Sequence, residues 1–230
     1  MAEKMRVMTL VERKDISPDL AIFRFQTDTK FVFEAGQFCV VSLGGVKRPY
    51  SVFSSPQDPD IELLIKLVPG GALTTLLWKL SPGDRVEMFQ ARGRGNFLFD
   101  ESVEHHAMFA TGTGIAPFRS MVRHYAATGR WKFYIFQGVS YVDELSACCL
   151  EFSKTPHVIH TPAVSRPNDP RNTAWDGVVG RLPEQASTLM AKFGLTPANS
   201  IVYACGHLGM VEGIKEVLGP EGFKIKEEKY

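Results

Sequence analysis

The pattern of glycine, proline and apolar residues changes near residue 100, and this change limits the folds that the chain can adopt. Before Phe99, glycine and proline break the sequence into short segments rich in β-branched and aromatic residues. Segments of this kind predict strands, here over residues 6–13, 20–26, 37–43, 50–53, 61–67 and 85–90. One helix is expected among them, over residues 72–80. Short strands at this spacing indicate a small antiparallel β-barrel.

After Phe99 the pattern alternates between apolar runs and helical segments. Strands are expected over 106–110, 132–137, 157–161 and 200–204, and helices over 116–127, 143–152 and 207–218. This alternation predicts a parallel sheet with helices on its faces. We therefore expect two domains, an antiparallel β-barrel over residues 1–100 and an α/β parallel-sheet domain over residues 101–230.

Composition argues against several classes of partner. Lys and Arg number 26 and Asp and Glu 25, so the net charge of +1 provides no general attraction to nucleic acid or an anionic membrane. No apolar run reaches the roughly 18 residues that an integral membrane segment needs, and a cytoplasmic location is expected. The four cysteines lack the C-x-x-C spacing of a metal site, so no metal is expected.

The tetrapeptide Arg48-Pro49-Tyr50-Ser51 enters one of the predicted strands. Pro49 fixes its own φ and biases the preceding residue toward extended backbone. An arginine can pair bidentately with a pyrophosphate, an aromatic ring can cover the face of a flavin, and a hydroxyl can bond the flavin N5 edge. Taken alone, the tetrapeptide fits a surface arginine beside an ordinary strand tyrosine equally well.

A glycine turn follows in the segment Val68-Pro69-Gly70-Gly71-Ala72-Leu73-Thr74-Thr75. Its glycines free backbone N–H groups where a helix is expected to begin, and a helix N-terminus favours an anionic phosphate. A plain turn before a capped helix is the alternative. Coming after an arginine-bearing strand, the segment predicts the second half of a pyrophosphate clamp.

The predicted strand over 106–110 runs directly into Thr111-Gly112-Thr113-Gly114-Ile115-Ala116-Pro117. The glycines permit a tight turn with close backbone approach to a ligand, and Pro117 suits the first turn of a helix. Dinucleotides bind at such loops, at the carboxyl ends of parallel strands. The proline departs from the G-x-G-x-x-G pattern, and a glycine turn without a ligand is the alternative.

The later strand over 200–204 repeats this arrangement and ends in Cys205-Gly206. We expect Cys205 at the strand end facing the crevice, with Gly206 leaving room and Met210 on the helix behind. A lone cysteine is usually a small buried apolar residue. Its place beside a second glycine turn favours a role facing a ligand.

In this order the motifs R-x-Y-S, G-G-x-L-T, G-T-G-I-A-P-F and Y-x-C-G-x-x-G-M resemble the ferredoxin/flavodoxin–NADP(+) reductase superfamily, over nearly the whole chain. The resemblance implies an FAD-binding barrel and an NADP-binding α/β domain. The residues it implies for FAD are Arg48, Pro49, Tyr50, Ser51, Gly71, Ala72, Leu73, Thr74 and Tyr230. Those implied for NADP are Gly112, Thr113, Gly114, Pro117, Arg166, Arg181, Cys205, Gly206 and Met210.

The resemblance also implies a catalytic set, namely Ser51 near flavin N5, Cys205 near the nicotinamide, and Glu228 and Tyr230 at the carboxyl terminus. The last ring would stack on the flavin until nicotinamide displaces it, although many chain termini are frayed. Hydride transfer between nicotinamide C4 and flavin N5 requires the two rings in contact, so the domains must align them.

Arg166 and Arg181 are the positions that the resemblance implies for the 2′-phosphate of NADP, while Ser140 stands where many bacterial members carry another arginine. The implied function is electron transfer between NADP(H) and a separate one-electron carrier, ferredoxin or flavodoxin. Two alternatives are an NAD(P)H reductase component that feeds an oxygenase or cytochrome, and a relay subunit of a larger redox complex.

Overall fold

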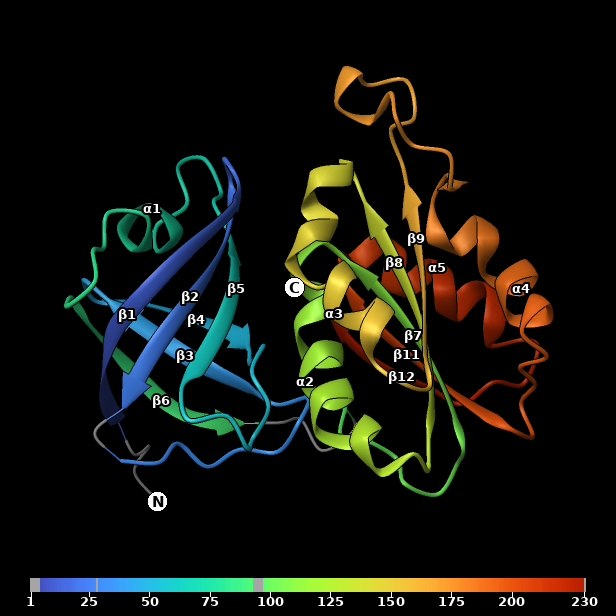
Figure 1. Ribbon diagram of the computed structural model, residues 1–230, viewed down its shortest axis with the longest axis horizontal. Helices are drawn as coiled ribbons and strands as arrows, with labels where there is room; N and C mark the ends of the chain where they lie inside the picture. Colours follow the sequence, from blue (N-terminus) through green and yellow to red (C-terminus); the bar gives the residue numbers. More distant parts are fainter. Residues whose placement is uncertain (1–4, 28, 93–96, 230) are drawn as a thin grey trace.

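The computed structural model describes residues 5–27, 29–92 and 97–229, which form two bodies lying side by side (Figure 1). The first is an antiparallel sheet with the strand order β4-β3-β6-β1-β2-β5. Its strands are β1 (Met5–Ser17), β2 (Leu20–Thr27), β3 (Phe38–Leu43), β4 (Val46–Ser51), β5 (Ile61–Lys66) and β6 (Arg85–Arg92).

The two edge strands of this sheet meet and nearly close it into a barrel. Val52, directly after β4, forms an antiparallel bridge with Leu63 of β5. The Phe53 N–H donates to the Glu62 carbonyl at 2.8 Å. Because this closure pairs the two edge strands with each other, it leaves few of their backbone N–H and C=O groups without a partner strand. The predicted antiparallel barrel is therefore confirmed.

Alternation along the strands fills the barrel interior with large apolar side chains. Phe23 and Phe25 of β2 are fully buried with Leu63 and Met88 from other strands. The predicted helix over 72–80 is much shorter, because α1 spans only Thr74–Leu77. After it, the N–H groups of residues 79 and 80 bond carbonyls three residues back, which tightens the chain into turns.

The second body is a parallel sheet with the order β10-β9-β8-β7-β11-β12, as the alternating pattern predicts. Its strands are β7 (His105–Thr111), β8 (Lys132–Val139), β9 (Val158–Val164), β10 (Val178–Val179), β11 (Ser200–Gly206) and β12 (Ile225–Lys229). Helices α2 (Ile115–Tyr125) and α3 (Cys149–Lys154) lie between sheet and barrel, and α4 (Leu182–Lys192) and α5 (Leu208–Leu218) cover the outer face (Figure 1).

Two helical segments of this body differ from the sequence-based expectation. The segment expected as one helix over 143–152 is a 3-10 helix, η3 (Val142–Ala147), followed by α3. Helix α4 was not predicted, although Pro183 in its first turn is a recognisable start signal, and the Glu184 carboxylate accepts from the Arg181 N–H at 3.3 Å. The remaining 3-10 helices are η1 (Gly112–Gly114), η2 (Ala126–Thr128) and η4 (Pro170–Asn172).

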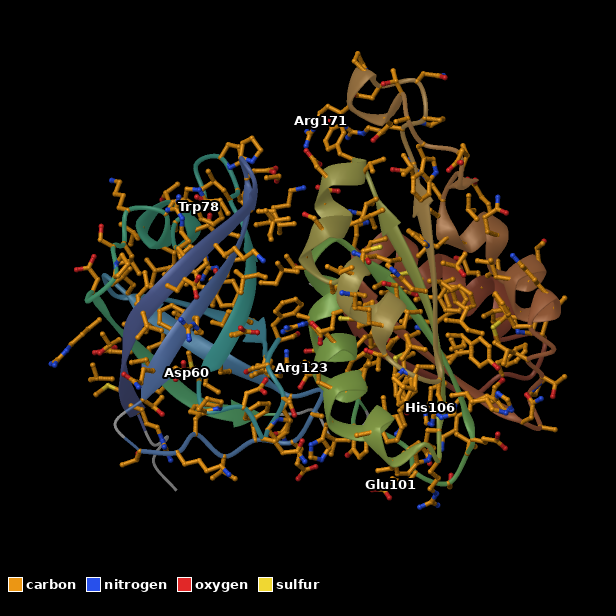
Figure 2. The ribbon with its side chains drawn as sticks, viewed as in Figure 1. Asp60, Trp78, Glu101, His106, Arg123 and Arg171 are labelled. Atoms are coloured by element: carbon orange, nitrogen blue, oxygen red, sulfur yellow. The ribbon has the colours of Figure 1, made fainter. Side chains whose placement is uncertain are left out.

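Helix α2 is buried on both sides, and this joins the two bodies. Its Phe118 and Met121 share one apolar cluster with Phe53 and Leu64 of the barrel and with strands of the parallel sheet. Figure 2 shows Arg123 of α2 at the boundary, where it forms an ion pair with Asp58 at 2.8 Å.

Within the described ranges, no helix is long and apolar enough to cross a membrane. The same ranges contain no cluster of three or more His, Cys, Asp or Glu residues suited to hold a metal ion.

Candidate active site

A cavity of about 1100 Å³ opens between the two bodies, at the carboxyl ends of the parallel strands. The barrel contributes β4, the end of β5 and the glycine turn after it. The sheet contributes the loops after β7, β8 and β11, together with the end of β12. The site residues expected from the sequence that line it are Arg48, Pro49, Tyr50, Ser51, Gly71, Ala72, Leu73, Thr74, Gly112, Thr113, Arg181, Met210 and Glu228.

Strand β4 brings Arg48, Tyr50 and Ser51 to the barrel side of the cavity. The Arg48 side chain is exposed, so its guanidinium is available to an anionic ligand. Tyr50 is half-buried, and burial raises its pKa to about 12; the charge of Arg48 lowers this pKa by a smaller amount, and Cys39 raises it slightly. Its phenol therefore stays protonated and presents a neutral ring to the cavity.

Beyond β5, the turn over residues 68–74 also borders the cavity. The Thr74 hydroxyl accepts from the Val68 N–H at 3.2 Å and lies 3.3 Å from the Val68 carbonyl. This hydroxyl closes the turn from within. The expectation that Thr74 donates to a phosphate stays a prediction.

The loops after β7 and β11 pack directly on each other, and two glycines make this possible. A Cβ on Gly114 would lie 2.2 Å from the Cys205 carbonyl oxygen. Gly206 has a φ of +138°, and a Cβ there would lie 2.4 Å from Thr111 Oγ1. Both glycines and the buried Pro117 lie behind the cavity wall and do not line it. They shape the loops that do.

Cys205 is the last residue but one of β11, and its side chain does not line the cavity, contrary to the expectation from the sequence. It is 0% exposed and belongs to the apolar cluster beneath α2. Alternation places it on the same sheet face as Tyr203, toward the packed helix. Burial, and secondarily the charge of Glu228, raises the pKa of the thiol well above its usual value. Glu228 pairs with Cys205 in register and lines the cavity, whereas Tyr230 lies outside the described residues.

The two arginines expected for the 2′-phosphate occupy different places. Arg181 is exposed and lines the cavity at the start of α4. Arg166 does not line it, and its guanidinium donates to the Tyr141 hydroxyl at 2.6 Å. Arg171, labelled in Figure 2 on the loop beyond β9, stacks on the same ring at 3.5 Å and pairs with Asp143 at 2.6 Å.

Sequence reasoning missed a polar group on the cavity wall formed by Asp19, Lys66 and Glu144. The Lys66 ammonium bonds Glu144 Oε1 at 2.5 Å and lies 3.5 Å from Asp19. Burial opposes the charge of Lys66, but its bond to Glu144 and the nearby carboxylates raise its pKa. Lys66 and Glu144 are 78 positions apart, and neither belongs to a local motif that could have revealed the pair.

The size and the lining of the cavity match an anionic dinucleotide. Its volume exceeds the roughly 300–1,000 Å³ of a usual single-ligand pocket. Arg48 and Arg181 supply exposed cationic groups, and Tyr50 supplies an aromatic ring. Cations match pyrophosphate and the ring matches a planar heterocycle. The fold and site together define a two-domain protein with a dinucleotide-sized cavity between its domains.

Comparison with known proteins agrees with this class. Residues 7–97 match the oxidoreductase FAD-binding domain family, and residues 108–216 match the oxidoreductase NAD-binding domain family. A solved ferredoxin NADP+ reductase from Neisseria gonorrhoeae, with bound FAD and NADP, has the same fold at a TM-score of 0.83. It is 24% identical, and the alignment covers 99% of each chain.

Two curated relatives identify the family of this chain more closely. The flavodoxin/ferredoxin–NADP reductase of Escherichia coli is 34% identical over 78% of this chain and 76% of its own length. The phenol hydroxylase P5 protein of Acinetobacter pittii is 31% identical over 76% of this chain, which spans only 51% of that relative. The chain belongs to the ferredoxin–NADP reductase family, and its two domains are those that bind FAD and NAD(P) in that family.

Proposed function

We propose that this chain is a flavoenzyme that transfers electrons between NADP(H) and a separate one-electron carrier protein, such as ferredoxin or flavodoxin. The observation that carries the proposal is a single cavity lined by the barrel motif over 48–51 and by the loops after β7 and β11. Because both sets of residues border one space, two ring systems bound there can meet. The similarity to a flavodoxin/ferredoxin–NADP reductase supports the choice of partner.

On the barrel side, Arg48 and the turn over 71–74 are proposed to hold the FAD pyrophosphate, with Tyr50 against the flavin and Ser51 at its N5 edge. Bound FAD supplies a hydride acceptor that can release electrons singly, which ordinary side chains lack. On the sheet side, Gly112 and Thr113 border the space for the nicotinamide dinucleotide.

Cys205 and Glu228 are proposed to set the floor and side of the nicotinamide position. The thiol is buried in the apolar cluster under α2, and burial keeps it neutral, so it contributes shape and not charge. Glu228 lines the cavity one strand away, where its side chain can accept a hydrogen bond from a bound ring. Cys205→Ala is expected to slow hydride transfer far more than it weakens FAD retention, and equal loss of both would mean that the cysteine is only structural.

The visible absorption spectrum of the purified protein tests this function. We expect the bands of oxidised flavin, bleaching when NADPH is added without oxygen, and electron delivery to added ferredoxin or flavodoxin. Ser51→Ala should retain the bands but bleach more slowly, because the hydroxyl is proposed to act at N5. A protein that neither binds FAD nor oxidises NADPH would refute the proposal.

A reductase component that feeds an oxygenase is the second candidate, favoured by the similarity to the phenol hydroxylase P5 protein. It predicts rapid NADPH or NADH oxidation with poor transfer to free ferredoxin and flavodoxin. Comparing turnover with these carriers against turnover with an isolated [2Fe–2S] domain separates the two. A relay subunit, in contrast, would oxidise neither nicotinamide cofactor in isolation.

A further inference from the structure

Ion pairs connect the two domains at two levels of their boundary. Arg119 of α2 binds Glu62 of the barrel deep in the interface at 2.7 Å, and Arg123 binds Asp58 at its more exposed margin at 2.8 Å. At the cavity wall, Lys66 at the end of β5 binds Glu144 of η3. Figure 1 shows β5 as the barrel strand that faces α2 and α3. The second pair therefore bridges the domains where the ligands are proposed to bind.

Glu144 uses its two carboxylate oxygens for different purposes. Oε1 accepts from the Lys66 ammonium, while Oε2 accepts from the Ser140 N–H at 3.0 Å and the Tyr141 N–H at 3.3 Å. The Glu144 side chain is only 6% exposed, whereas that of Lys66 is 37% exposed. One buried carboxylate thus ties a barrel cation to the backbone that follows β8.

The backbone held by Glu144 is part of the cavity wall. Val139 and Ser140 line the cavity on the sheet side. Asn172 also holds the β8 loop, residues 140–142. Its amide donates to the Ser140 carbonyl at 2.9 Å, and its oxygen accepts from the Val142 N–H at 2.9 Å. The position of the loop relative to the sheet is set by Asn172, and its position relative to the barrel by Lys66 through Glu144.

We propose that Lys66 and Glu144 form a positioning pair, in which a cation of the FAD domain fixes the β8 loop and thereby sets the affinity of the second domain for its dinucleotide. This inference deepens the proposed function and rests on it. Neither residue acts on the reacting atoms. The pair acts through the loop, so it should control dinucleotide binding more than the rate of chemistry.

The consequence of breaking the pair follows from burial. Lys66→Met leaves Glu144 in a water-poor site without its cation, and a buried carboxylate then gains by moving toward water. That movement releases the Ser140 and Tyr141 N–H groups. Glu144→Gln keeps an oxygen for these two groups but has no charge for Lys66. Both changes are expected to loosen the loop, with Lys66→Arg restoring the ion pair.

The test uses the FAD-loaded protein and four variants, Lys66→Met, Lys66→Arg, Glu144→Gln and the Lys66→Met/Glu144→Gln double variant. For Lys66→Met we expect the NADP+ dissociation constant and the NADPH KM to rise about tenfold, equivalent to about 1.4 kcal/mol, with kcat within about twofold. Glu144→Gln should weaken binding in the same direction. The double variant should be no worse than Lys66→Met, because the two residues act as a unit.

Lys132→Met serves as the matched control. It removes an ion pair with Glu104, 2.8 Å long, at the opposite ends of the parallel strands from the cavity. Dinucleotide binding should be unchanged in this variant. Unchanged or tighter binding in Glu144→Gln, or additive losses in the double variant, would overturn the proposal, because Lys66 would then act on the ligand by itself.

Hydrogen exchange gives a readout that does not depend on turnover. The amides of residues 140 and 141 should exchange faster in Lys66→Met and Glu144→Gln than in the unsubstituted protein, with Lys66→Arg and Lys132→Met unchanged. Equal exchange in all of them would also overturn the proposal. Hydrogen exchange does not require FAD. It therefore tests the Lys66–Glu144 pair even if the protein proves to lack the proposed function.

Discussion

Replacing Arg119 by Met probes how firmly the two domains are joined. The Arg119 side chain is 8% exposed, and its guanidinium donates to Glu62 and Glu151, each at 2.7 Å, and to the Phe53 carbonyl at 2.9 Å. It also lies over the Phe53 ring at 4.0 Å. Methionine fills similar space but leaves two carboxylates and one carbonyl without their donor.

The magnitude follows from the exposure of the partners. Removing one member of a buried ion pair costs about 3–5 kcal/mol. Because the Glu62 and Glu151 side chains are 24% and 30% exposed, water compensates for part of the loss, and we expect the low end, about 3 kcal/mol. In a chain of this size each kcal/mol shifts the Tm by about 2–4 °C, so Arg119→Met should lower it by roughly 6–12 °C.

Differential scanning calorimetry is the appropriate assay, because it also reveals whether the two domains begin to unfold separately. Glu62→Gln retains an acceptor for Arg119, so its Tm should fall by about half as much as that of Arg119→Met. Arg130→Met removes an exposed pair with Glu101 at 3.9 Å and should stay within about 2 °C, as surface pairs contribute little. A Tm loss for Arg119→Met as small as that of Arg130→Met would refute the reasoning.

Three further predictions concern single residues. Burial lowers the pKa of His106 from 6.5 to about 4, so the unfolded chain binds a proton that the folded one does not. The free energy of unfolding should therefore fall between about pH 6.5 and 4, by up to about 1.4 kcal/mol per pH unit, and urea titrations of His106→Gln should show a flatter profile. At pH 8, iodoacetamide should modify the half-buried Cys149 but spare Cys205 until urea is added, as followed by mass spectrometry; equal rates would contradict the burial of Cys205. Arg181→Ala should raise the KM for NADPH about tenfold while leaving that for NADH within about twofold, and an equal rise for both would argue against a 2′-phosphate contact.

Much of the fold could be predicted because its signals are local. Alternating apolar residues and Gly-Pro turns located the barrel strands, and the change of rhythm near residue 100 indicated the parallel sheet. The exact domain limits at 100 and 101 and the cytoplasmic location stay predictions. Helix α1 was overestimated because propensity does not reveal that Leu73 and Leu77 are drawn into the barrel core, after which the chain turns.

The site was predictable where one short segment carries the chemistry. The motif over 48–51 and the turn over 71–74 both border the cavity. Cys205 shows where such reasoning stops, because a motif gives its position at the strand end but not which face of the sheet its side chain occupies. The Lys66–Glu144 pair shows a second limit, since a contact between distant segments exists only after both domains have folded.

The double burial of α2 has a consequence for dividing this chain. The Phe118 and Met121 side chains that meet Phe53 and Leu64 would face water if residues 101–230 were produced alone. The isolated fragment would then expose an apolar surface that favours aggregation. Either domain could be exchanged for that of a relative only if the new domain packs equally well at the α2 interface. The two domains are therefore fitted to each other.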